Sequence, residues 1–178
     1  MPTVTPKILF KFMQGRVEAV AQTLVGSIRV AMPEPKSPPK PSKKKLFGET
    51  APEVPAALAT NVVISIRPSA GSGAPTFLQE LPIQVGEGTW SLQLPDLHPG
   101  SRHWILFEIG FDQPTGSALS RRRVAEIELA WSPTLPGKGN RRTRLNADVE
   151  LVNRVLVEPP DPEIQRRHAL LISGRSDG

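Results

Sequence analysis

The sequence predicts a mainly β protein: an antiparallel β-sandwich of about six to eight strands, with a short N-terminal helix and strand segment and a C-terminal helix. Two observations support this class. Between residues 61 and 151, stretches of alternating apolar and polar residues recur, and sequences rich in glycine and proline separate them. Spacing typical of helices is confined to short segments. We therefore expect the sandwich to span residues 46–158.

The first 45 residues divide into two predicted parts. In residues 1–32, the apolar positions of Val17–Val25 recur three and four residues apart, which predicts a short amphipathic helix, and residues 27–32 suit a short strand. Residues 33–45 contain five prolines and five lysines. A segment of this composition is typical of an extended, disordered linker, because it cannot bury apolar surface.

The strands of the predicted sandwich follow in order. A short helix is expected near Pro55, because proline suits the first turn of a helix. From Asn61 onward the period of the pattern changes to two, which is the period of a strand with one buried face. Pro82 interrupts the second strand region and indicates an edge strand or a bulge. The predicted strands cover residues 61–68, 77–85, 90–94, 104–111, 124–131 and 143–151.

A C-terminal helix and a frayed tail are expected over residues 159–178. Asp161 is a favourable N-cap residue, and Pro162 suits the first helical position. The helix is expected to end at Ser173 and Gly174. Its apolar stripe comprises Ile164, His168, Leu171 and Ile172.

The basic character of the chain comes from the linker. The formal net charge is +5, and the isoelectric point is about 10.0. Without the five lysines of the linker, 17 basic and 17 acidic residues remain. The linker is therefore a candidate contact for polyanions such as RNA or anionic lipid, and a solvated tether is the simpler interpretation. The lysines are Lys36, Lys40, Lys43, Lys44 and Lys45.

Arginines on two predicted strands form a candidate interaction surface. They are Arg121, Arg122, Arg123, Arg141, Arg142 and Arg144. Glu126 and Glu128 lie two residues apart on one of these strands and therefore share a face. Paired carboxylates can carry out acid–base chemistry or bind calcium. Pairing with the arginines of the next strand is the role that we expect for them.

Trp90, Trp104 and Trp131 fall on three successive predicted strands. We expect them to fill the core between the sheets, and a binding groove lined by them is the alternative. No apolar run approaches the roughly 18 residues that a membrane-spanning helix needs.

The sequence offers no set of residues typical of a metal or cofactor site. His98, His103 and His168 are too dispersed for zinc, which needs three or four clustered ligands. The chain has no cysteine, which removes disulfides and thiolate ligands and fits a cytoplasmic location. We expect no cofactor.

Four stretches carry a family resemblance: residues 61–68 (NVVISIRP), 94–100 (LPDLHPG), 106–108 (LFE) and 124–131 (VAEIELAW). Together they resemble the β-sandwich that follows the von Willebrand factor A domain in many bacterial A-domain proteins. In that family a V-x-L-x-I-x-P strand opens the sandwich, and a DL-x-x-G turn precedes a strand that ends in glutamate. A VAE strand then ends at an aromatic residue, and a helical tail follows. The resemblance covers roughly residues 54–172.

The A domain and its metal-binding D-x-S-x-S motif are not found in this sequence, so the resemblance carries over no metal site. The chain looks like the back half of such a protein. The resemblance implies a non-enzymatic scaffold that binds a protein partner, with a second copy of the chain as one option. Two alternatives stay open. One is a nucleic-acid-associated protein that uses the lysine linker and the arginines, and the other is a carbohydrate-binding or enzymatic sandwich that uses the tryptophans and glutamates.

Overall fold

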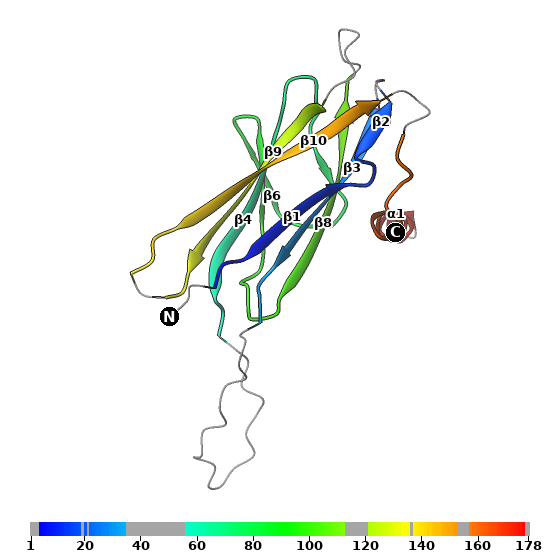
Figure 1. The fold of residues 1–178 in the computed structure, drawn as a ribbon. Coiled ribbons are helices and arrows are strands. Elements are labelled where there is room, and N and C mark those ends of the chain that lie inside the picture. Colours follow the sequence, from blue (N-terminus) through cyan, green and yellow to red (C-terminus); the bar gives the residue numbers. More distant parts are fainter. Residues whose placement is uncertain are drawn as a thin grey trace, which may run out of the picture.

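The computed structural model describes residues 4–18, 20, 22–34, 56–112, 121–135, 137–152 and 157–176. Within these residues it contains ten strands in two sheets and one C-terminal helix (Figure 1). The mainly β class and the sandwich predicted from the sequence are confirmed. The predicted linker falls almost wholly outside the described residues, as does the start of the predicted helix near Pro55.

One layer is a four-stranded sheet with the order β1-β3-β8-β5. Its strands are β1 (Lys7–Phe12), β3 (Gln22–Ala31), β8 (Arg102–Phe111) and β5 (Thr76–Phe77). All of its pairings are antiparallel. Because β5 has only two residues, this sheet covers little of the opposite layer on that side.

The other layer is a six-stranded sheet with the order β2-β10-β9-β4-β7-β6. Its strands are β2 (Arg16–Glu18), β10 (Arg141–Val152), β9 (Arg121–Pro133), β4 (Ala59–Pro68), β7 (Thr89–Gln93) and β6 (Ile83–Gly86). β2 runs parallel to β10, and the other pairs are antiparallel. The region that the sequence predicts as one interrupted strand is thus divided: β5 joins one sheet and β6 becomes the edge of the other, as Pro82 indicates.

The core lies between the two sheets and is built by alternation along the long strands. Fully buried side chains of the central strands are Val62, Ile64, Ile66, Ile105, Phe107, Ile109, Ile127 and Leu129. The alternation predicted for β4 and β9 is confirmed. Successive residues of a strand point to opposite faces, and in these strands one face is buried in the core.

The helix α1 (Pro162–Ser176) lies beside the strands of the four-stranded sheet (Figure 1). Ile164 is 3% exposed and packs with Val25, Leu78 and Leu106 in a second apolar cluster. α1 therefore covers part of the outer face of this sheet. The helix runs to Ser176, past its predicted end, because glycine within a helix carries only a modest penalty.

The predicted N-terminal helix is wrong. Val17 and Glu18 belong to β2, and Gln22–Val25 begin β3. Leu24 faces the core between the sheets, and Val25 is buried on the opposite face in the cluster beneath α1. A strand that is covered on both faces loses its alternation, which is why the spacing imitated a helix. Residues 56–58, expected to be helical, have no helical structure and lead into β4.

The pairing of the N-terminal strands also shows how they lie relative to the sandwich, which the sequence left open. β3 pairs with β8 over ten residues, from Gln22 opposite Phe111 to Ala31 opposite Arg102. β1 extends the same sheet. The N-terminal strands are therefore part of the sandwich.

Candidate functional site

The start of α1 is fixed by Asp161 at its N-cap position. The Oδ1 atom of Asp161 accepts hydrogen bonds from the backbone N–H groups of Glu163 and Ile164, at 3.0 and 3.1 Å. Its Oδ2 atom lies 2.6 Å from the Nζ atom of Lys11 on β1. The hydrogen bond from Lys11 and those from the backbone lower the pKa of the Asp161 carboxyl, and the same carboxylate raises the pKa of Lys11. The predicted N-cap is confirmed.

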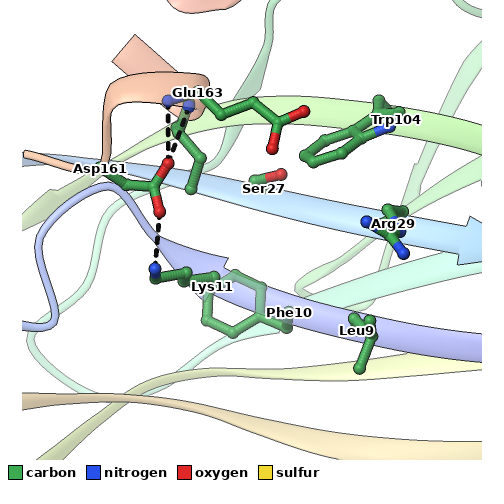
Figure 2. Close-up of a pocket in the computed structure, with 9 residues that line it drawn as sticks. Leu9, Phe10, Lys11, Ser27, Arg29, Trp104, Asp161 and Glu163 are labelled. Atoms are coloured by element: carbon green, nitrogen blue, oxygen red, sulfur yellow. Dashed lines mark hydrogen bonds and ion pairs between the residues drawn. The ribbon is translucent and has the colours of Figure 1, made fainter.

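A groove of about 320 Å³ lies on the outer face of the four-stranded sheet, next to the start of α1 (Figure 2). We call it the Trp104 groove. Its lining comprises Leu9, Phe10, Lys11, Ser27, Arg29, Trp104, Asp161, Glu163 and Ile164. Figure 2 shows the Lys11–Asp161 pair at one end and Leu9, Arg29 and Trp104 together at the other.

The register of the strands explains why Leu9, Arg29 and Trp104 lie together at one end of this groove. Leu9 on β1 lies directly opposite Arg29 on β3, and Arg29 lies directly opposite Trp104 on β8. Directly opposite residues project from the same face of a sheet, so the three side chains form a row across it. Leu9 is 58% exposed.

Two guanidinium groups lie over the indole of Trp104. The Cζ atom of Arg167, from α1, is 4.0 Å from the ring centroid, and that of Arg29 is 5.5 Å away. Arg167 also pairs with Glu163 at 3.3 Å. Arg29 forms no ion pair or hydrogen bond through its side chain with the residues that the structure describes, and its Nε atom is buried without an acceptor. Arg29 therefore carries an unpaired positive charge in the groove.

The edge strand β6 is a second unusual surface. All four of its residues, Ile83–Gly86, are exposed. Ile83 pairs with the buried Leu92, and Val85 pairs with Trp90, so the aliphatic side chains point to the core side of the sheet. They are nevertheless 41% and 63% exposed. The reason is that the four-stranded sheet ends at the two-residue β5 and leaves this part of the wider sheet uncovered.

Most of the predicted arginine surface is a network of ion pairs on the outer face of the six-stranded sheet, which we call the arginine network. Arg144 lies 2.6 Å from Glu128 and 4.0 Å from Glu126. Arg142 also reaches Glu128, at 4.0 Å. The hydrogen bond with Glu128 raises the pKa of Arg144. The expected Arg–Glu pairing across strands is confirmed.

The other predicted arginines lie toward the ends of the same strands. Arg121 and Arg123 approach Asp148 at 3.0 and 3.8 Å. Arg122 and Arg141 are paired in register with the buried residues Val149 and Trp131, so they project from the opposite face at opposite ends of the sheet. The structure therefore does not gather the six arginines into one patch. The lysines Lys36, Lys40, Lys43, Lys44 and Lys45 lie outside the described residues.

The tryptophans do not share one environment. Trp131 is buried in the core, and Trp90 of β7 is partly buried and packs against the same core cluster. Trp104, predicted to be a core residue, instead lies on the outer face of the four-stranded sheet. The sequence could not distinguish the two faces of β8, because Leu106 on the outer face is buried beneath α1 and the strand is apolar on both sides.

His103 and His168 lie on different elements, β8 and α1, and His98 lies in the turn before β8. His168 on α1 lies 2.8 Å from Glu108 on β8. Burial lowers the pKa of His103. No group of three or more potential metal ligands occurs within the described part of the chain. No helix in that part is long and apolar enough to cross a membrane.

Sequence reasoning did not single out Leu9 or Arg29. A signal for Leu9 was present, because Ile8, Phe10 and Phe12 alternate with Lys7, Leu9 and Lys11 as an exposed-edge strand would. Nothing local could show that Leu9, Arg29 and Trp104 are neighbours, since that depends on pairing between distant strands.

No protein-family model matches the chain, and no curated protein matches it significantly. Among solved structures, the major pilin subunit of Bacillus cereus is similar, with a TM-score of 0.52 and 7% sequence identity. The match covers 83% of this chain and 40% of the pilin chain, so this chain spans less than half of that protein. Fold and surfaces together define a β-sandwich module with a helix packed on one outer face.

Proposed function

We propose that the chain is a non-enzymatic β-sandwich module that binds another protein by accepting an extended strand along β6. The observation that carries this proposal is the exposure of Val85, which is 63% exposed although it points to the core side of its sheet. An apolar side chain in that position is left for a further strand to cover.

The backbone of β6 supports the same proposal. Glu87 and Gly88 form a two-residue turn, with φ values of 50° and 71°, so Gly86 and Thr89 are the hydrogen-bonded pair next to it. Alternation along an antiparallel pair then directs the backbone N–H and C=O groups of Ile83 and Val85 away from β7. β6 also lacks the charged residues that usually protect an edge strand from pairing.

Two likenesses agree with a binding role. The similar solved structure is a pilin subunit, and a subunit is part of an assembly. The resemblance to the sandwich behind von Willebrand factor A domains also implies a scaffold that binds proteins. Membership of that family, a bacterial source and a cytoplasmic location are parts of this proposal.

The test compares the natural chain with Val85→Lys and with Val85→Thr as its matched control. Val85 is 63% exposed, so neither change should unfold the sandwich, but a lysine on the edge opposes strand addition. We expect self-association in sedimentation velocity, or capture of a defined protein from cell extract, to be lost with Val85→Lys and kept with Val85→Thr. Equal binding by both variants, or no binding by the natural chain in either assay, contradicts the proposal.

The nucleic-acid alternative depends on the lysine linker, because most of the described arginines on β9 and β10 have acidic partners. It predicts salt-dependent binding of RNA that is lost when Lys43, Lys44 and Lys45 are changed to alanine. The carbohydrate-binding alternative requires a common aromatic face, which the separate positions of the tryptophans do not provide.

A further inference from the structure

We infer that the Trp104 groove is a second binding site, which holds the acidic side chain of a peptide segment from a partner protein. In this arrangement Arg29 binds the carboxylate, and Leu9 and Trp104 contact an apolar neighbour of the acidic residue. The inference concerns a different surface from β6 and does not depend on strand addition there.

The first step is that α1 covers only part of the outer face of the four-stranded sheet. Ile164 packs over Val25 and Leu106, and His168 reaches Glu108. In the row of Leu9, Arg29 and Trp104, the side chain of Arg167 from the helix lies over Trp104, while Leu9 remains 58% exposed. A groove with aliphatic, aromatic and cationic walls is left open at this boundary (Figure 2).

The second step is the charge of the uncovered part. The next row along the sheet is Lys7, Ala31 and Arg102, which are directly opposite one another. This row and the row of Leu9, Arg29 and Trp104 together contain three cations, Lys7, Arg29 and Arg102, and neither row contains a carboxylate. An acidic ligand is therefore complementary to this surface.

The third step considers which charged side chains in the groove have a partner of opposite charge. Lys11 neutralises Asp161 at 2.6 Å, and Arg167 neutralises Glu163 at 3.3 Å. Among the described residues, Arg29 is left without an anionic partner, and its buried Nε atom has no acceptor. An arginine presents parallel N–H groups that match the two oxygens of a carboxylate, so this side chain provides the specific contact.

The environment of Trp104 favours a peptide over a nucleic acid. Bases bind to tryptophan by stacking on its face. Here the guanidinium groups of Arg29 and Arg167 already lie over the ring, at 5.5 and 4.0 Å from its centroid. The ring is therefore better placed to support Arg29 and to give an apolar wall than to stack with a base.

The test uses an array of amidated peptides in which a single Glu or Asp is flanked by apolar residues, each paired with a Gln or Asn twin. We expect the full chain to bind acidic members about tenfold or more tightly than their twins, as a charge-assisted contact implies. Arg29→Gln should remove this preference, and Arg29→Lys should restore only part of it. Arg141→Gln removes the same charge from another surface and should leave the preference intact.

Further controls make each outcome decisive. Leu9→Ser changes an exposed residue and should weaken binding of both peptide types without unfolding the chain, while Val85→Lys should have no effect at this site. Circular dichroism checks the fold of each variant. The inference is overturned if acidic peptides and their twins bind equally, if Arg29→Gln keeps the preference, or if no peptide binds. Binding of single-stranded oligothymidine that requires Arg29, without any preference for acidic peptides, overturns it in favour of a phosphate ligand.

Discussion

Gly26 on β3 leaves the space of its missing side chain to the ring of Phe107 on β8. A Cβ atom at Gly26 would lie 2.5 Å from the Cζ atom of Phe107 and 3.1 Å from the Cε2 atom of Phe10. Phe107 is fully buried and sits beside the rings of Phe10 and Phe77, at centroid distances of 6.1 and 6.2 Å. The packing of these aromatic rings thus depends on a glycine at this position of the sheet.

The first prediction is that Gly26→Ala destabilises the sandwich through overpacking. We expect the free energy of unfolding to fall by about 1–3 kcal/mol, and Tm to fall by roughly 2–4 °C for each kcal/mol. Gly110→Ala is the matched control, because a Cβ atom at Gly110 in β8 meets no described atom within 4 Å. Urea titration followed by tryptophan fluorescence measures both. Equal stability of the two variants would show that Phe107 can move aside at no cost.

The second prediction concerns the attachment of α1 to the sheet. Ile164→Ala removes a side chain that is 3% exposed and should weaken docking by about 2–4 kcal/mol. Hydrogen exchange of α1 amides should then accelerate more than that of β9. Leu170→Ala, at a position 62% exposed on the same helix, should change stability by less than about 0.5 kcal/mol. Similar exchange in both variants would mean that Ile164 does not hold the helix.

The third prediction is that the contribution of the Lys11–Asp161 ion pair to stability depends on pH. The pKa of Asp161 is lowered from 3.8, so its contribution to stability is present above that value and is lost as the pH falls below it. The pKa of Lys11 is raised from 10.5, so the contribution of Lys11 is present below that value and is lost as the pH rises above it.

The substitution Asp161→Asn distinguishes the contribution of this ion pair to stability from the contribution of the N-cap. Asparagine keeps the side-chain oxygen that caps the helix, whereas Asp161→Ala removes the cap at a cost of about 0.5–2 kcal/mol. We expect Asp161→Asn to lower stability by less than about 1 kcal/mol near pH 7, because Lys11 is exposed. In chemical denaturation, this difference should shrink as the pH falls below 3.8 and vanish once Asp161 is protonated in the folded protein. A constant difference across the pH range would show that the ion pair is not its cause.

The fourth prediction is that the arginine network on β9 and β10 contributes little to the free energy of unfolding. Arg144 and Glu128 are 57% and 23% exposed, and exposed ion pairs contribute about 0–1 kcal/mol. Glu128→Gln should therefore reduce the free energy of unfolding by less than about 1 kcal/mol, and the loss should shrink in 1 M salt because the charges are screened. A loss above about 2 kcal/mol that persists in high salt would assign a structural role to this pair.

The sequence predicted the alternation of buried and exposed side chains where one face of a strand packs in the core and the other face contacts solvent. In β9, Ile127 and Leu129 are buried while Glu126 and Glu128 point outward, and this alternation is legible in the residues alone. The N-cap at Asp161 is equally local, because it depends on a side chain bonding to backbone two and three residues away. Prediction failed at β3 and at Trp104, where α1 buries the outer face and removes the contrast between the two sides.

The sequence by itself determined the alternation of β4 and β9, the start of the final helix at Asp161 and Pro162, and the position of the excess positive charge in residues 36–45. Only the tertiary structure decided the order of the strands and therefore which side chains become neighbours. Leu9, Arg29 and Trp104 form a row because β1, β3 and β8 pair across long stretches of chain, and β6 is uncovered because the two sheets differ in width. Periodicity sets the face of a side chain, whereas long-range pairing sets its partners.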